Sequence, residues 1–297
     1  MNWIKRTALL SVVIIASGAF VYGISTENKN KITHEGTTLY FPTSIDFAGE
    51  AAPLQITDVR ERLDRELLIN ANLDATTLLI IKRANRAFPI IEPILAKYGV
   101  PDDFKYLAVI ESALVNAVSP AGARGVWQFM PVTAKEKGME VTDMVDERYH
   151  LQKSTEAACK YLLEAKAKFG NWTLAAASYN GGMTGVTKQI EMQQVSNYYD
   201  LLLNDETSRY VFRILALKEI MKDPAKYGFM VDPNDLYTNL PSKIITVDTT
   251  INDLSAFAKA QGINYKILKI HNPWLRDKKL LNASGKKYEI EIPLSGY

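Results

Sequence analysis

Apolar and small residues recur at helical spacing from about residue 57 to residue 230 of this 297-residue chain. In the clearest example they are four, three, four, three and four positions apart: Leu151, Thr155, Ala158, Leu162, Ala165 and Phe169. Residues at such intervals share one face of an α-helix, and an apolar face must pack against other elements. The pattern predicts a mainly α-helical domain over residues 57–232.

Further segments have the same spacing. One begins at Thr57 and a second at Asp74, each an expected N-cap, and Pro89 and Pro93 are expected to limit the second. A third runs over 101–113. Later helices are expected around 175–179, which ends in Asn-Gly-Gly, and around 210–221. Between them, residues 118–131 contain two glycines and two prolines, so a loop or small hairpin is expected there.

The composition changes after Pro241. Residues 241–297 hold nine Lys and Arg against five Asp and Glu, a net +4, which leaves 26 against 28, or −2, for the rest. A β-like stretch at 244–247 precedes two short helical patterns and an alternation at Tyr288, Ile290 and Ile292. Residues 241–297 are therefore expected to form a small α+β module. Its positive charge suits an anionic polymer or is an ordinary solvated surface.

The first residues indicate export. Lys5 and Arg6 precede an uncharged run from Thr7 to Ser25, which is typical of a signal peptide or an uncleaved membrane anchor. Residues 1–25 are assigned to that segment, and the polar, turn-rich stretch 26–56 is expected to be a linker. The predicted location is the cell envelope or periplasm, with membrane contact through the N-terminal segment if it is not cleaved.

Several functional classes are excluded by composition. The single cysteine, Cys159, allows no intrachain disulfide and no multi-cysteine zinc site, and His34, His150 and His271 are too far apart for a compact metal motif. A formal charge of +2 does not indicate a nucleic-acid binder. There is no glycine-rich phosphate loop. We therefore expect no metal, no cofactor and no nucleic-acid partner. Cys159 is expected to be a buried small hydrophobe.

Glu111 is the candidate for acid–base chemistry. It follows the apolar run Tyr-Leu-Ala-Val-Ile and precedes the glycine-bearing loop. A carboxyl group partly removed from water has a raised pKa, as a general acid near neutral pH requires. Position alone favours the alternative, an ordinary solvated glutamate at a helix end.

Blocks of sequence around Glu111 strengthen the first interpretation. These are Glu111-Ser112-Ala113, residues 119–134, Tyr161-Leu162, the Ala-Ala-Ala-Ser-Tyr-Asn-Gly-Gly run over 175–182, and residues 206–211. Their order and spacing from about Val100 to Met221 resemble the lytic transglycosylases with a goose-type lysozyme fold. The likeness is greatest to the membrane-bound type D branch of that family.

The resemblance implies that Glu111 is the acid/base that cleaves the bond between N-acetylmuramic acid and N-acetylglucosamine in peptidoglycan. The muramyl C6 hydroxyl would attack C1 and leave a 1,6-anhydro end, without a cofactor. Most glycosidases use two carboxylates, roughly 5 to 9.5 Å apart. Asp102 and Asp103 lie about 12–13 Å from Glu111 along a continuous helix and are poor partners. An intramolecular attack needs no second carboxylate.

The same resemblance implies roles for five neighbours of Glu111. Ser119 would orient the catalytic glutamate, Gln128 would contact the glycan, and Tyr179 and Asn180 would bind the sugar. Tyr210 would point its hydroxyl toward Glu111. The alternatives from the residues alone are a turn serine before Pro120, ordinary loop hydrogen bonding by Gln128, and core packing of the two tyrosines.

Residues 244–293 resemble a LysM domain, a βααβ fold that binds N-acetylglucosamine-containing polymers. Asp248-Thr249 replaces the usual Gly-Asp before the threonine. Two roles stay open for this module, glycan binding and a degenerate, packed appendage. For the whole chain, the resemblance implies a peptidoglycan lytic transglycosylase. The alternatives are a non-catalytic peptidoglycan-binding envelope protein and a hydrolytic muramidase on the same fold.

Overall fold

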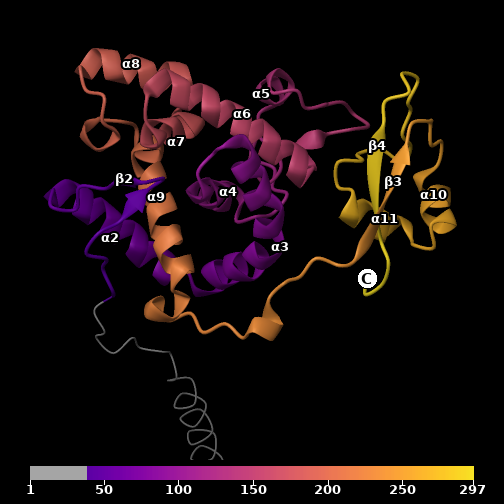
Figure 1. Ribbon diagram of the computed structural model, residues 1–297, viewed down its shortest axis with the longest axis horizontal. Coiled ribbons are helices and arrows are strands. Elements are labelled where there is room, and N and C mark those ends of the chain that lie inside the picture. The colour runs from indigo at the N-terminus through magenta and orange to yellow at the C-terminus, as the bar shows by residue number, and fades with distance from the viewer. Residues whose placement is uncertain (1–38) are drawn as a thin grey trace, which may run out of the picture. The chain divides into compact units, whose positions relative to one another are not determined.

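The computed structural model describes residues 39–297, of which 40–297 form one compact unit (Figure 1). The predicted signal peptide or anchor at 1–25, and the start of the predicted linker, lie outside the described residues. Within 39–297, no helix is both long and apolar enough to span a bilayer.

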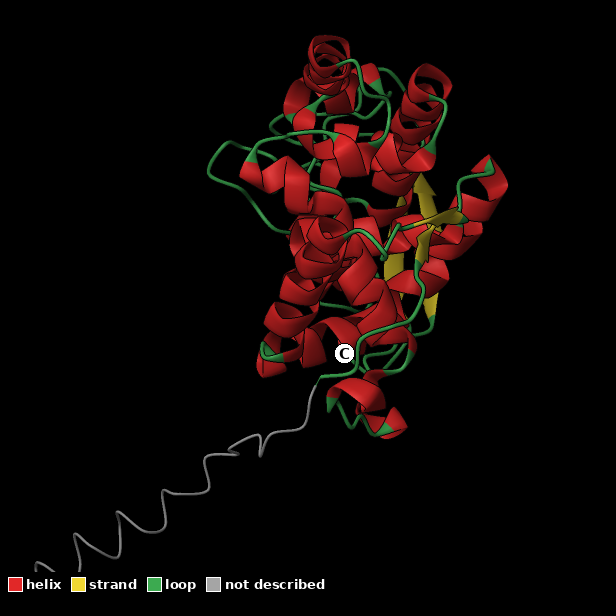
Figure 2. Cartoon of the chain, turned by 90° about the vertical axis from the view of Figure 1, so that its left-hand side faces the viewer, coloured by secondary structure: helices red, strands yellow, loops and turns green. Residues whose placement is uncertain are grey.

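The first part of the unit is helical, as the spacing of apolar residues predicts, and Figure 2 shows that strands are few and short. Five single-turn 3₁₀ segments lie between or after the α-helices: Asp102–Phe104, Glu147–Tyr149, Tyr198–Asp200, Pro224–Tyr227 and Pro233–Asp235. The α-helices are α2 (Thr57–Ala71), α3 (Asp74–Tyr98), α4 (Lys105–Ser112), α5 (Pro131–Glu136), α6 (Leu151–Phe169), α7 (Trp172–Gly181), α8 (Met183–Gln193) and α9 (Asp205–Lys222).

Helix α7 is largely buried. Its residues Thr173 to Ser178 are all buried, and three of them are alanines. Such small side chains let neighbouring helices approach closely, and α7 packs against α6, α8 and α9. Helix α4 lies in the middle of the helical part, against α3 and α9 (Figure 1). This arrangement brings the C-terminal end of α4, which carries Glu111, beside α9.

The prediction that Pro89 and Pro93 limit the second helix is wrong. Helix α3 continues through both prolines and ends at Gly99, which adopts the left-handed conformation (φ 70°). A proline removes one backbone donor and leaves the carbonyl four residues earlier without its helical partner. Pro89 and Pro93 are both exposed, as is Asn85, four residues before Pro89. Solvent can hydrate the carbonyls on this face, so the helix tolerates both residues.

The predicted N-caps are each one residue late. Ile56 and Leu73 occupy the N-cap positions of α2 and α3 and make no side-chain capping bond. Their carbonyls accept from the N–H groups of Arg60 and Thr77, so the helical bonding begins one residue before Thr57 and Asp74.

The described part of the predicted 26–56 linker is not a free tether. Strands β1 (Asp46–Phe47) and β2 (Glu50–Ala51) form a small hairpin in which the Phe47 side chain is completely buried and packs edge-to-face on Phe104. Glu50 accepts from the backbone N–H groups of Trp172 (2.6 Å) and Thr173 (2.9 Å) at the start of α7. These contacts attach the segment to the helical part. The polar composition of the segment did not predict them.

The C-terminal module has the predicted βααβ order: β3 (Ser242–Val247), α10 (Leu254–Ala260), α11 (Tyr265–His271) and β4 (Tyr288–Pro293). The strands pair antiparallel, with Ser242 opposite Pro293 and Val247 opposite Tyr288. Their buried face and the two helices enclose an apolar core that also includes Val145 and Tyr149 from the helical part. The small core is thus completed by residues from outside the module.

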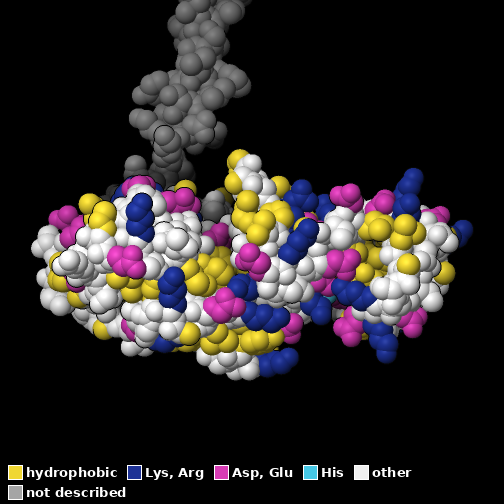
Figure 3. Space-filling model, turned by 90° about the horizontal axis from the view of Figure 1, so that it is seen from above, with side chains coloured by type: hydrophobic (Ala, Val, Ile, Leu, Met, Phe, Trp, Pro, Cys, Tyr) yellow, Lys and Arg dark blue, Asp and Glu magenta, His cyan; other side chains and the backbone are white. Residues whose placement is uncertain are grey.

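The surface drawn in Figure 3 mixes charges of both signs rather than gathering one of them. The excess of lysine in the module is partly neutralised, because Lys286 lies 2.6 Å from Glu140 and 3.3 Å from Glu147 of the helical part. Part of the module's positive charge is therefore paired with carboxylates of the same chain, which favours an ordinary surface charge over a binding site for an anionic polymer.

Candidate active site

Glu111 lies in the last turn of α4. The helix ends because Ala113 and Leu114 both adopt positive φ, 52° and 60°, a conformation rarely taken by residues other than glycine. The Ala113 N–H still bonds to the Val109 carbonyl at 2.8 Å. Two arginines contact the same turn, since Arg213 of α9 donates to the Ile110 carbonyl (3.1 Å) and Arg83 of α3 donates to the Ala113 carbonyl (3.3 Å). The strained turn is therefore held from both sides.

The carboxyl group of Glu111 is partly buried and accepts a hydrogen bond from the Tyr210 hydroxyl. Burial raises its pKa from 4.5 to about 7, against the opposing effects of the Tyr210 bond and the charge of Arg213; Glu206 adds to the rise. A carboxyl group with this pKa is protonated about half the time at neutral pH, so it can both donate and accept a proton.

Tyr210 is almost fully buried on α9, as its place on the apolar stripe predicts. Burial, together with the nearby Glu111, raises the pKa of its hydroxyl well above 10, so the tyrosine stays a hydrogen-bond donor. Its predicted orientation toward Glu111 agrees with this geometry.

Asp102 and Asp103 have partners elsewhere. Asp103 accepts from the Ala48 N–H (2.6 Å) and from Lys218 (2.7 Å), and Asp102 pairs with Lys105 (2.6 Å). Neither contributes to the pKa of Glu111, whereas Glu206 in the first turn of α9 does. Glu206 is exposed. It is an acidic neighbour of Glu111 that sequence spacing does not reveal.

Residues 117–129, here called the 117–129 loop, cover one side of this region. The predicted hairpin is present as a short turn in which Arg124 pairs with both Val118 and Phe129. Gly125 has φ 85°, and a Cβ there would lie 1.8 Å from the Arg148 carbonyl oxygen. The backbone of the loop thus lies directly on the chain at residue 148, and only glycine fits this contact.

Ser119 and Gln128 serve the loop itself. The Ser119 hydroxyl accepts from the Ala123 N–H at 3.0 Å and makes no bond to Glu111 in the described structure, so the implied orienting contact is not seen. The Gln128 amide nitrogen donates to the carbonyls of Gly125 (2.7 Å) and Ala117 (3.1 Å). Its amide oxygen has no bond within the described residues and remains an acceptor for a ligand hydroxyl.

Tyr179 is half-buried near the end of α7, and its hydroxyl donates to the Trp127 carbonyl at 2.8 Å. Its ring packs edge-to-face against Phe129 and Tyr161. Burial, with Glu111 as the next contribution, raises the pKa of Tyr179 well above 10. In this structure the tyrosine joins α7 to the 117–129 loop, close to Glu111.

Asn180 accepts from the Thr207 hydroxyl at 2.7 Å through its amide oxygen. That bond fixes the side chain and leaves its NH₂ group, a pair of donors, without a bond in the described structure. Asn180 and Gln128 thus offer complementary groups to a ligand, a donor and an acceptor respectively.

Besides Arg83 and Glu206, three contributing residues were missed from the sequence. Ser112 is buried and donates to the Val126 carbonyl (2.8 Å), which ties the turn after Glu111 to the 117–129 loop. Arg213 and Thr207 act from α9, as described above. The apolar spacing predicted a helix around 210–221, and the family block covers 206–211, but neither specified these contacts.

Other groups do not form a competing centre. Burial raises the pKa of the Cys159 thiol to about 12, in keeping with its predicted place in the core. Within residues 39–297, no three His, Cys, Asp or Glu side chains gather as ligands for a metal ion. The described chemistry therefore centres on one carboxyl group that has a pKa near 7 and a tyrosine partner.

Two known domain families match parts of the chain. The transglycosylase SLT domain family matches residues 88–201, which include Glu111, Ser119, Gln128, Tyr179 and Asn180. The soluble lytic transglycosylase C-terminal LysM-like domain family matches residues 243–296. The chain therefore contains an SLT transglycosylase domain followed by a LysM-like domain.

Two curated relatives have the same printed name, membrane-bound lytic murein transglycosylase D, from Escherichia coli strain K12 and Escherichia coli O6:H1. Each is 29% identical to this chain over 256 residues, which cover 83% of this chain and 55% of the relative. The chain thus spans about half the length of these relatives, and their name agrees with the resemblance of the sequence blocks to the type D branch.

Proposed function

We propose that this protein is a peptidoglycan lytic transglycosylase with Glu111 as its single acid/base. The observation that carries the proposal is the Glu111 carboxyl group, which has a pKa of about 7, contacts Tyr210 and lies within the residues 88–201 that match the SLT family. The names of the relatives support murein, or peptidoglycan, as the substrate.

In the proposed reaction, protonated Glu111 donates its proton to the glycosidic oxygen between N-acetylmuramic acid and N-acetylglucosamine. The bond from that oxygen to muramyl C1 breaks, and the muramyl C6 oxygen bonds to C1. The C6 hydroxyl proton passes to the Glu111 carboxylate, which restores the acid. The products are a glucosaminyl 4-hydroxyl and a 1,6-anhydromuramyl end, with no water consumed.

The supporting residues fall into two groups in this proposal. Tyr210 orients Glu111, and Gln128 and Asn180 bind the sugar through the amide groups that remain free. Ser119 and Tyr179, which were expected to contact Glu111 and the sugar, contribute through the shape of the 117–129 loop. No metal or organic cofactor enters this scheme.

The test is mass spectrometry of products from purified peptidoglycan incubated with the full-length protein and, separately, with Glu111→Gln. We expect soluble anhydromuramyl products from the wild type alone. Binding without products from either protein would refute the enzymatic proposal and leave the alternative of a peptidoglycan-binding envelope protein.

A hydrolytic muramidase is the second candidate, because Glu206 lies near enough to affect the pKa of Glu111 and could activate water. The Glu206→Gln variant separates the two. Intramolecular attack predicts anhydro products and a rate within about threefold of wild type. Reducing-end muramyl products from the wild type, lost in Glu206→Gln, would instead identify a hydrolase.

We also propose that the protein acts in the cell envelope, exported by its N-terminal segment. The basic and apolar start of the chain and the word "membrane-bound" in the relatives' name support this location. Fractionation of cells that produce the full-length chain would test it, since recovery in the cytosolic fraction would contradict export.

A further inference from the structure

The 117–129 loop rests on residues 144–149, here called the 144–149 segment. Besides the contact of Gly125 with the Arg148 carbonyl, the Asn116 side chain donates to the Tyr149 carbonyl at 3.5 Å. Because a Cβ at Gly125 would overlap the Arg148 carbonyl, the two backbones lie in close contact, and a displacement of the segment toward the loop would displace the loop.

Arg148 makes the strongest connection between the two. Its guanidinium is buried and makes two bonds to Asp146, at 2.8 Å and 2.7 Å. The remaining terminal nitrogen donates to the carbonyls of Gly122 and Phe129, each at 3.1 Å. One side chain thus joins the segment to both ends of the turn that contains Gln128. A guanidinium has the number and geometry of donors for this arrangement, and a lysine does not.

The opposite side of the same segment belongs to the C-terminal module. The Asp146 N–H donates to the Trp274 carbonyl (2.9 Å), and the Arg276 N–H donates to the Met144 carbonyl (2.8 Å). Val145 pairs with Leu275 as an isolated β-bridge, and both are buried. The Trp274 ring stacks on Tyr288 of β4, 5.7 Å between centroids.

Polar contacts close the edge of this junction. Glu140 accepts from the Tyr288 hydroxyl (3.0 Å) and from Lys286 (2.6 Å). Glu147 accepts from the Glu140 N–H (2.7 Å) and lies 3.3 Å from Lys286. The module therefore contacts the 144–149 segment through backbone hydrogen bonds, a shared apolar core and ion pairs.

We propose that the C-terminal module is a brace for the active-site loop, with Arg148 as the positioning residue that transmits its support. By fixing the 144–149 segment, the module fixes the carbonyls of Gly122 and Phe129 and so the place of Gln128. Its effect on catalysis rests on the proposed function. The support of the loop does not, because it can be measured without substrate.

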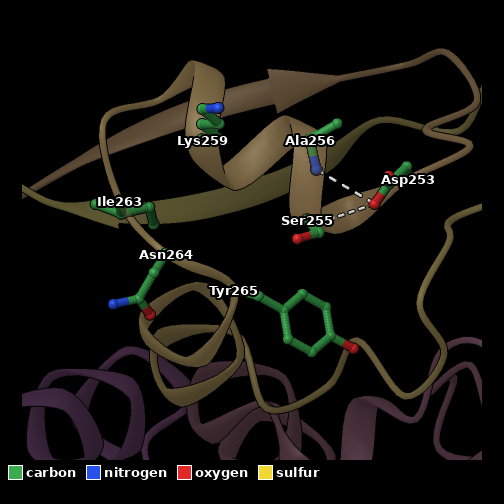
Figure 4. A pocket seen from close by; sticks show the side chains of 7 residues that line it. All are labelled: Asp253, Ser255, Ala256, Lys259, Ile263, Asn264 and Tyr265. Carbon is green, nitrogen blue, oxygen red and sulfur yellow. Dashed lines mark hydrogen bonds between the residues drawn. The ribbon is translucent and has the colours of Figure 1, made fainter.

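The brace is separate from a second feature of the module, an open pocket of about 350 Å³ between α10 and α11 (Figure 4). Asp253 caps α10 beside it, bonded to the backbone of Ser255 and Ala256, and Tyr265 lines its other side. If the module assisted the enzyme by holding glycan in this pocket, Tyr265 would matter and Trp274 would act only through the fold of the module.

Besides the wild type, the experiment uses the full-length protein as five single variants and as the double variant Arg148→Lys with Trp274→Ala. Arg148→Lys keeps the charge but loses the bonds to the loop, and Trp274→Ala removes the stacked ring at the junction. Lys286→Ala is a milder junction variant that leaves Trp274 in place, in case its loss unfolds the module. Tyr265→Ala tests the pocket. The matched control is Lys243→Ala, an exposed lysine of β3.

The first measurement is hydrogen exchange of the amides of Ser119, Arg124, Gly125 and Phe129, all hydrogen-bonded within the loop. We expect their exchange to rise about tenfold or more in Arg148→Lys and Trp274→Ala, and less in Lys286→Ala. Tyr265→Ala and Lys243→Ala should match the wild type. Unchanged loop exchange in Arg148→Lys, or in both junction variants, would overturn the proposal.

The second measurement is kcat and KM on a short soluble glycan. We expect KM to rise about tenfold in Arg148→Lys and Trp274→Ala, with a smaller change in kcat. The reason is that Gln128 is proposed to bind the sugar, whereas Glu111 transfers the proton. The double variant should be no worse than the poorer single variant, since both act through one segment. Effects that multiply, or loss of activity in Tyr265→Ala alone, would contradict the brace.

The two measurements test separate claims, because hydrogen exchange needs no substrate whereas kcat and KM depend on the proposed function. A wild-type protein that cleaves no glycan would refute the proposed function and leave the exchange result to decide whether the module supports the loop.

Discussion

Replacing Glu111 by glutamine removes a carboxyl group whose charged form the folded protein disfavours. The pKa of this group is about 7 in the folded chain and 4.5 in an unfolded one. Below pH 4.5 it is protonated in both states and has no effect on stability. Between the two values the folded state holds a proton that the unfolded state has released, so the free energy of unfolding falls as pH rises.

The size of the effect follows from the same two values. Each pH unit corresponds to about 1.4 kcal/mol, so the charged Glu111 costs about 3 kcal/mol of stability above pH 7. Glutamine keeps the shape and the acceptor for Tyr210 and never ionises. Glu111→Gln should therefore match the wild type at about pH 4.5 and be about 3 kcal/mol more stable at about pH 8.

Urea unfolding of both full-length proteins across this pH range measures the difference directly. The matched control is Glu61→Gln, which removes a carboxylate from the exposed surface of α2 and should give a much smaller pH-dependent change. A Glu111→Gln difference that stays within about 1 kcal/mol from pH 4.5 to pH 8, or one that decreases as pH rises, would refute the burial of this acid.

Three further predictions test the surroundings of Glu111. Tyr210→Phe removes a hydrogen bond that lowers the pKa of Glu111, so the descending limb of the pH profile of kcat/KM should shift to higher pH by about one unit. The maximum of kcat/KM should fall about tenfold or more. A descending limb at the wild-type pH would contradict the contact. Gly125→Ala places a methyl group against the Arg148 carbonyl, so it should lower the free energy of unfolding in urea by about 2 kcal/mol or more. The control is Gly185→Ala, which should change the free energy of unfolding little because Gly185 is exposed and has open space around it. Phe47→Ala should cost about 3–5 kcal/mol because the ring is fully buried, and a loss under about 1 kcal/mol would show that the 40–56 segment is a tether after all.

The helical part was predictable where one face decides the structure. The stripe that includes Leu162 and Ala165 indicates α6 because burial of that face outweighs local preferences, and α9 is found for the same reason. Local composition predicts the structure poorly in segments whose burial depends on one or a few residues. A single side chain, Phe47, holds the β1–β2 hairpin, and exposed Pro89 and Pro93 did not stop α3.

The contact of Glu111 with Tyr210 was predictable, but the other contacts around the candidate site were not. Glu111 and Tyr210 come from separate blocks whose meeting only the family likeness implied, and the structure brings them together. Spacing cannot say which way a polar side chain points. Ser119 and Gln128 direct their bonds at the backbone of their own loop, and the contacts of Arg148 join segments more than 18 residues apart in sequence.

Under the proposed function, the hydrogen bonds that the site already makes limit how it can hold a sugar. Gln128 uses its two donors on loop carbonyls, and Tyr179 uses its hydroxyl proton on the Trp127 carbonyl. Gln128 can therefore offer a sugar only its amide oxygen, whereas Asn180 offers its NH₂ group. A bound glycan must donate on the side of the loop and accept on the side of α7. The loop can keep this polarity only while its own bonds remain intact, which is why its support from the 144–149 segment bears on substrate binding.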